Sequence, residues 1–202
     1  MAEGLGKNEV AKELTDSLKR AVAALEGQGI PYLLGGGLGC WARGGPPSSN
    51  DIDLMIKPED AQRAQDALAE AGMRPDTPPE QWLLKAWDGD ILIDLIFEPS
   101  GMRIDDEVIE RGEVLSVMAM KIRVMDLDDL IATKLLALDE HSADYGDLLM
   151  ITRALREQLD WAKLREETAE SPFAAAFFVL ADGLEICPAA RTPASLYPGS
   201  SE

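Results

Sequence analysis

The hydrophobic positions of the chain follow two spacings, one typical of helices and one typical of strands. From Asn8 to Gln28 the apolar side chains lie three or four residues apart, which predicts an amphipathic helix ended by Gly27 and Gly29. The apolar runs that come next are too short for helices. They predict strands at residues 31–34, 51–56, 82–87 and 91–97, with weaker strands at 114–118 and 121–124.

Helical patterns separate these strands and then replace them. A short helix is predicted at residues 38–43 and a longer one at residues 58–71. From Asp126 to about Leu184 nearly every segment has helical spacing. Asp126, with Asp129 three residues later, is typical of a helix start, where carboxylates cap backbone N–H groups and complement the helix dipole.

This layout predicts an α/β (α+β) fold in two parts. Residues 1–125 are expected to form a small mixed β-sheet flanked by helices, and residues 126–186 a C-terminal helical bundle. Residues 187–202 are rich in Pro, Ser and Ala, and we expect a disordered tail there. At 202 residues the chain is long enough to bury a full core.

Composition excludes some classes of protein. No apolar run approaches the roughly 20 residues that a membrane-spanning helix needs, so no membrane association is expected. The polar N-terminus lacks the apolar core of a signal peptide. Cys40 and Cys187 are too few for a disulfide framework or a zinc cage. A reducing cytoplasm is therefore the expected location.

The charge balance bears on the partner. The chain has 19 Lys and Arg against 37 Asp and Glu, a formal net charge of −18. Proteins that bind nucleic acid by its backbone usually carry a basic face, so nucleic acid is a poor candidate partner. Attraction of a small cationic molecule and ordinary acidic solubility both fit this balance.

Two carboxylates stand out in the stretch LLGGGLGCWARGGPPSSNDIDLMI, residues 33–56. Side chains alternate along a strand, so Asp51 and Asp53 lie on one face. Adjacent carboxylates repel each other unless a cation lies between them, and Mg²⁺ prefers such oxygen ligands. A solvated strand edge is the alternative reading of the pair.

A third carboxylate favours the metal reading. Asp94 is the one polar residue in ILIDLIF, residues 91–97, which reads as a buried central strand. A buried carboxylate needs a cation or hydrogen bonds, and a partner arginine or a capping role would also meet this need. Together, Asp51, Asp53 and Asp94 match the set that binds two metals roughly 4 Å apart for phosphoryl or nucleotidyl transfer.

The glycines before this pair suit an anion. Gly36 and Gly37 lie between a predicted strand and a short helix, where backbone N–H groups favour a phosphate and no Cβ blocks its approach. The run lacks the GK[ST] of a P-loop and the spacing of GxGxxG. An ordinary turn explains the glycines equally well, so their weight comes from their position ahead of the aspartates.

The segment GGLGCWARGGPPSSNDIDLMI resembles the signature of the DNA polymerase β-like nucleotidyltransferases. The resemblance is to the minimal bacterial branch, which includes proteins akin to abortive-infection toxins and small antibiotic-modifying nucleotidyltransferases. It implies that Gly36 and Gly37 bind phosphate and that Asp51 and Asp53 bind metal. Asp94 would be the third metal ligand, which in this family can also act as the general base.

The resemblance continues to about Leu149. Lys134, in DDLIATKLLAL, is similar to a helical lysine that reaches the nucleotide phosphates, although a lysine that packs its stem on an apolar helix face is the alternative. Asp144 and Asp147, in ADYGDLL, match an acidic pair and are candidate contacts to substrate or nucleotide.

The chain departs from the family pattern before the DxD. Pro47 and Ser49 stand where many relatives carry an arginine and a threonine, so that Ser49 keeps only a hydroxyl for nucleotide binding. His141 follows Lys134 where basic residues are usual, and either replaces one of them or is a solvated loop residue. Trp82 and Trp87 either line a substrate groove or pack on the sheet.

The expected activity is Mg²⁺-dependent transfer of a nucleoside monophosphate from an NTP to a hydroxyl acceptor, with release of pyrophosphate. A small molecule or a protein is favoured as acceptor over transfer RNA, and the chain is expected to be a monomer or a small oligomer. The alternative is a catalytically weak nucleotide-binding module of the same fold, for example in a toxin–antitoxin pair, whose function is to bind a partner. The acceptor and the base preference stay open.

Overall fold

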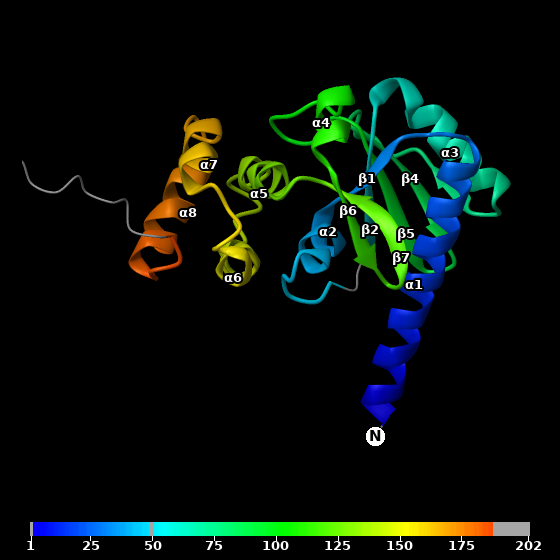
Figure 1. The fold of residues 1–202 in the computed structure, drawn as a ribbon, viewed down its shortest axis with the longest axis horizontal. Helices are drawn as coiled ribbons and strands as arrows, with labels where there is room; N and C mark the ends of the chain where they lie inside the picture. Colours follow the sequence, from blue (N-terminus) through cyan, green and yellow to red (C-terminus); the bar gives the residue numbers. More distant parts are fainter. Residues whose placement is uncertain (1, 49–50, 188–202) are drawn as a thin grey trace, which may run out of the picture.

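The computed structural model describes residues 2–48 and 51–187 and contains a seven-stranded mixed sheet (Figure 1). Its strands are β1 (Tyr32–Leu34), β2 (Asp51–Ile56), β3 (Arg74–Asp76), β4 (Leu83–Asp88), β5 (Ile91–Ile96), β6 (Glu113–Val117) and β7 (Met120–Val124). The strand order is β3-β4-β5-β2-β1-β7-β6. β2 therefore lies at the centre, antiparallel to β1 and parallel to β5.

Helices precede, connect and follow the strands. They are α1 (Ala2–Gly27), α2 (Gly36–Ala42), α3 (Ala61–Glu70), α4 (Asp106–Arg111), α5 (Leu127–Leu136), α6 (Tyr145–Leu155), α7 (Trp161–Glu167) and α8 (Pro172–Gly183), with a 3₁₀ turn η1 at Pro58–Asp60. Each of the last four helices begins at a side chain that accepts backbone N–H groups of the first turn. The four caps are Asp126, Asp144, Asp160 and Ser171.

The two faces of the sheet pack against different helices. Leu54 belongs to a core cluster that includes apolar residues of α1 and α3, whereas Met55 belongs to a cluster with α5 and α8. Figure 1 shows α1 and α3 on one side of the sheet and α2 and α5 on the other. Because side chains alternate along β2, Asp51 and Asp53 share the face of Met55 and point toward the α2 and α5 side.

The predicted mixed sheet with flanking helices and a helical C-terminal part is confirmed. β3 and α4 were not predicted from the sequence, because three residues around Pro75 and a six-residue helix carry too little periodicity to detect. The helix predicted at 58–71 begins as the 3₁₀ turn η1. The boundary at residues 125–126 stays a prediction.

Most of the predicted tail lies outside the described residues, which end at Cys187, a buried thiol. Within the described ranges, none of the helices is long and apolar enough to cross a membrane.

Candidate active site

Three aspartates meet on adjacent central strands of the sheet. Asp51 and Asp53 lie on one face of β2, and Asp53 pairs in register with Asp94 of β5. Each residue offers a carboxylate oxygen, and these oxygens all lie within 4.8 Å of one another. Among residues 2–48 and 51–187, this is the one group of three or more potential ligands with the spacing of a metal site.

The electrostatics of this triad oppose three simultaneous negative charges. Burial and the negative charge of Asp51 raise the pKa of Asp53 to about 7, against the nearby positive charge of Lys134. Burial also raises the pKa of Asp94, while Lys85 on the neighbouring strand β4 lowers it. A cation bound between the carboxylates would favour their charged forms and so oppose both shifts.

One atom of the triad lacks a hydrogen bond. Asp94 Oδ1 is buried and has no hydrogen-bond partner among the described residues. Lys85 Nζ lies 3.5 Å from it, which is longer than a charge-assisted hydrogen bond. A buried acceptor of this kind is costly unless a ligand satisfies it. The donor set, three carboxylates around an unsatisfied oxygen, fits a hard divalent cation.

The start of α2 packs directly against the triad. Gly36 has φ of 54°, in the left-handed region, and a Cβ at this position would overlap the Asp53 carboxylate. A Cβ on Gly37 would overlap the Ser48 hydroxyl. The Gly37 backbone N–H donates to Asp53 and lowers its pKa. Glycine is therefore required here for close packing as well as for backbone conformation.

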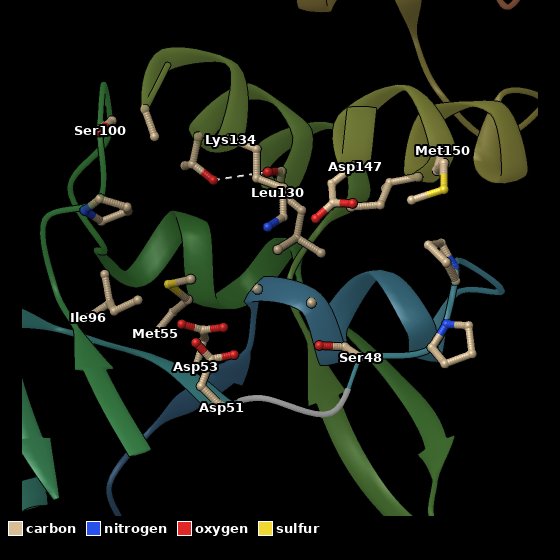
Figure 2. A pocket seen from close by; sticks show the side chains of 18 of the residues that line it. Ser48, Asp51, Asp53, Met55, Ile96, Ser100, Leu130, Lys134, Asp147 and Met150 are labelled. Atoms are coloured by element: carbon tan, nitrogen blue, oxygen red, sulfur yellow. Dashed lines mark hydrogen bonds between the residues drawn. The ribbon is translucent and has the colours of Figure 1, made fainter. Parts of the chain in front are cut away.

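A cavity of about 490 Å³ opens above the aspartates (Figure 2). Its floor is formed by the start of α2 and by Asp51 and Asp53, and its roof by α5 and α6. Figure 2 shows Lys134 and Asp147 projecting into it from those two helices. A second cavity of about 210 Å³ shares Lys134 and Asp147 with the first.

The cavity brings together most of the residues singled out in the sequence. These are Gly36, Gly37, Asp51, Asp53, Lys134 and Asp147, with Asp94 beside the two other aspartates. Asp144 instead lines the second cavity and caps α6 by accepting the N–H groups of Gly146 and Asp147.

Two of the three remaining positions of the family pattern lie within the described residues, and only one of them lines a cavity. Ser49 lies outside the described residues. Pro47 lines the main cavity, next to the hydroxyl of Ser48. His141 is exposed, lies 3.3 Å from Glu140 and lines neither cavity.

The family described as "Uncharacterised nucleotidyltransferase" matches residues 7–182. The chain belongs to this nucleotidyltransferase family. The match includes both the aspartates and the helical part, so the predicted enzyme class is confirmed. No curated protein matches the chain.

Solved structures of antibiotic nucleotidyltransferases have a similar fold. The solution structure of the antibiotic-resistance factor ANT(2″)-Ia is 18% identical, with a TM-score of 0.57 over 85% of this chain and 94% of that one. Its crystal structure with adenylyl-2″-tobramycin is 17% identical, with a TM-score of 0.55 over 82% and 97%. The lincosamide antibiotic adenylyltransferase LnuA, with lincomycin bound, is 15% identical, with a TM-score of 0.46 over 67% and 94%. At these identities the two ANT(2″)-Ia structures show a likeness of fold alone.

Two polar residues near the triad, Ser48 and Lys85, were not singled out from the sequence. Ser48 lines the cavity, and Lys85 lies opposite Asp94. Lys85 could have been found, because the short turn at Gly89 pairs Asp88 with Ile91 and so fixes Lys85 opposite Asp94. Ser48 gives no such signal, since a serine in a Pro/Ser loop is typical of any turn.

Proposed function

We propose that this chain transfers a nucleoside monophosphate from an NTP to a hydroxyl group of a small-molecule acceptor and releases pyrophosphate. The observation that carries the proposal is the triad, with the partnerless Asp94 Oδ1, beside a glycine-only helix start in one cavity. Membership of a nucleotidyltransferase family supports the reaction class.

In this proposal Asp51, Asp53 and Asp94 hold a divalent cation, with Mg²⁺ the expected ion because all the donors are carboxylate oxygens. When bound, such an ion neutralises phosphate charge and orients the reacting groups. Without it, the three carboxylates would repel a triphosphate.

The triphosphate would lie between α5 and the N-terminal residues of α2. Gly36 and Gly37 leave backbone without side chains facing the cavity, and Lys134 offers an ammonium from the opposite wall. Among the described residues no carboxylate forms an ion pair with Lys134 within 4 Å, so its ammonium group is available to bind a phosphate. Ser49 remains a proposed hydroxyl contact.

Asp94 is the proposed proton acceptor. The acceptor oxygen attacks the α-phosphorus, the bond from that phosphorus to the bridging oxygen of pyrophosphate breaks, and the hydroxyl proton passes to the Asp94 carboxylate. The position of Lys85, 3.5 Å from Asp94 Oδ1, favours the ionised carboxylate that this role requires.

The acceptor we propose is small and carries amino groups. Asp147 projects into the main cavity and Asp144 lines the adjoining one, so carboxylates outside the triad keep the cavity attractive to a cation after the triad is engaged. The net charge of −18 also favours a cationic acceptor. The fold neighbour ANT(2″)-Ia has been solved with adenylyl-2″-tobramycin, the product of such a transfer.

Mass spectrometry of reaction mixtures tests this function. Each of the four NTPs is incubated with Mg²⁺, the protein and either tobramycin or lincomycin, and the acceptor is examined for the added mass of one nucleoside monophosphate. The expected result is an added nucleotide that disappears with Asp53→Asn and persists with Val179→Ala, a change at an exposed α8 position outside both cavities. Pyrophosphate release without modification of either acceptor would contradict the acceptor class.

Pro47 favours a second candidate function, a nucleotide-binding module with little turnover. It lines the cavity where the resemblance places an arginine, so one phosphate or substrate contact is missing. That function predicts tight Mg²⁺–NTP binding with no pyrophosphate release, and equal binding by Asp94→Ala. Turnover that falls with Asp94→Ala would exclude it.

A further inference from the structure

Trp82 is exposed in the wall of the main cavity. It precedes the first residue of β4 and keeps 44% of its surface accessible. Its backbone carbonyl accepts the N–H groups of Phe97 and Glu98, which fixes the position of the residue. Among residues 2–48 and 51–187 its indole N–H has no hydrogen-bond partner, whereas those of Trp87 and Trp161 are bonded. A fixed, exposed tryptophan in a cavity is typical of a binding contact.

The residues around Trp82 form an apolar end of the cavity. Met55 and Ile96 lie at the C-terminal ends of the strands β2 and β5, and Pro99 and Ser100 follow β5. Figure 2 shows Met55, Ile96 and Ser100 to one side of the aspartates. On the opposite side the same view shows Ser48, Asp147 and Met150, so the aspartates divide the cavity into two ends.

The order of the strands indicates whether the nucleotide or the acceptor lies at the Trp82 end of the cavity. Gly36 follows β1, the strand on one side of β2, while Trp82 precedes β4, which lies beyond β5 on the other side. In an in-line displacement the attacking oxygen and the leaving pyrophosphate lie on opposite sides of the α-phosphorus. With the pyrophosphate at the glycines, the attacking hydroxyl comes from the side of Asp94 and β4.

The distance between Trp82 and Asp94 suits an acceptor that contains a ring. Lys85 lies opposite Asp94, and Trp82 is three residues before Lys85, just outside β4, which corresponds to about 10 Å at the rise of an extended chain. A hydroxylated compound of one or two rings spans that length when its reactive hydroxyl lies beside Asp94. We propose, on the basis of the proposed function, that Trp82 is the platform on which such an acceptor packs the apolar face of a ring, and that it determines acceptor specificity.

The proposal makes Trp82 a contact of the acceptor and separates it from the nucleotide. Truncation to alanine is expected to weaken acceptor binding at least tenfold, and to leave the Kd of the Mg²⁺–nucleotide complex within twofold. Trp82→Phe keeps an aromatic face and is expected to restore acceptor affinity to within threefold of the wild type. A role limited to folding would move both affinities together.

Fluorine NMR of the full chain labelled with 5-fluorotryptophan tests this directly. The chain has four tryptophans, and the Trp82 resonance is identified by its loss in Trp82→Phe. Mg²⁺ with a non-hydrolysable ATP analogue is added first, then tobramycin, lincomycin or, as an acyclic control, glycerol. Calorimetry of the Ala and Phe variants supplies the affinities. Val179→Ala serves as the matched control for an exposed apolar side chain outside the cavity.

The expected result is a Trp82 resonance that responds to tobramycin or lincomycin and not to glycerol, with the affinities described above. Three results would overturn the inference while nucleotide binding persists. The first is that the Trp82 resonance responds to nucleotide and the Ala variant binds nucleotide more weakly. The second is that a ring compound binds without a change in the Trp82 resonance. The third is that neither ring compound binds. Failure of the Mg²⁺–nucleotide complex to form would instead refute the proposed function, and this inference with it.

Discussion

Asp53 has the least favourable position of any carboxylate in the site, because it is packed against the start of α2 and flanked by two other aspartates. The sequence predicted the repulsion between Asp51 and Asp53 from strand alternation alone. It did not predict that Gly36 makes room for the Asp53 carboxylate itself. That contact depends on the turn after β1, which local sequence does not specify.

Asp53→Asn is expected to stabilise the protein in metal-free buffer. The folded-state pKa of about 7 lies above the ordinary value of 3.8, so the charged form is the unfavourable one in the folded state. The wild type therefore loses stability as the pH rises from about 4 to about 7, and the variant does not. Thermal melts in EDTA check this, with about 2–4 °C expected for each kcal/mol. A lower melting temperature for the variant at pH 8 would contradict it.

Gly36→Ala is expected to destabilise the chain by about 2 kcal/mol or more. The added Cβ overlaps the Asp53 carboxylate, and the φ of 54° is strained for any residue with a Cβ. Urea unfolding measures the effect. Gly183→Ala is the matched control, because nothing lies within 4 Å of the added atom and a change within about 1 kcal/mol is expected. Equal effects of the two variants would refute the packing argument.

At the scale of elements, α5 links the sheet to the later helices. Asp129, in its first turn, is 3% exposed at the side chain and accepts hydrogen bonds from the Nε–H and Nη2–H groups of Arg111 on α4. Lys163 of α7 lies 3.6 Å from its other oxygen. The sequence predicted Asp129 as a helix-start carboxylate and missed this role, because the partners lie 18 and 34 residues further away along the chain in opposite directions.

Arg111→Ala is expected to cost about 1–2 kcal/mol of stability, less than a fully buried pair because the arginine is 42% exposed. Since α5 also carries Lys134, weaker nucleotide binding is expected as well. Chemical denaturation and nucleotide titration measure the two effects. Arg156→Ala removes only an exposed pair with Glu157 and is expected to change stability by less than about 0.5 kcal/mol. Equal losses in both variants would argue against a linking role for Asp129.

At the scale of the whole molecule, the sequence predicted the architecture from two periodicities and the site from three aspartates. β2 and β5 were both identified, and Asp94 in its apolar run pointed to their proximity, because a buried carboxylate needs a partner. The shape of the cavity was not predictable. It depends on how α5 and α6 lie over the sheet, and their contacts are long-range apolar packing that many sequences of similar pattern would satisfy.

If the triad of Asp51, Asp53 and Asp94 is a catalytic metal site, as we propose, pyrophosphate release by the protein depends on Mg²⁺ and on Asp94. Release is followed for the wild type and for Asp94→Asn, with nucleotide binding measured in parallel. We expect release that stops in EDTA, and that falls by about a hundredfold or more in the variant while nucleotide still binds. Release of equal rate by Asp94→Asn, or release that persists in EDTA, would contradict it.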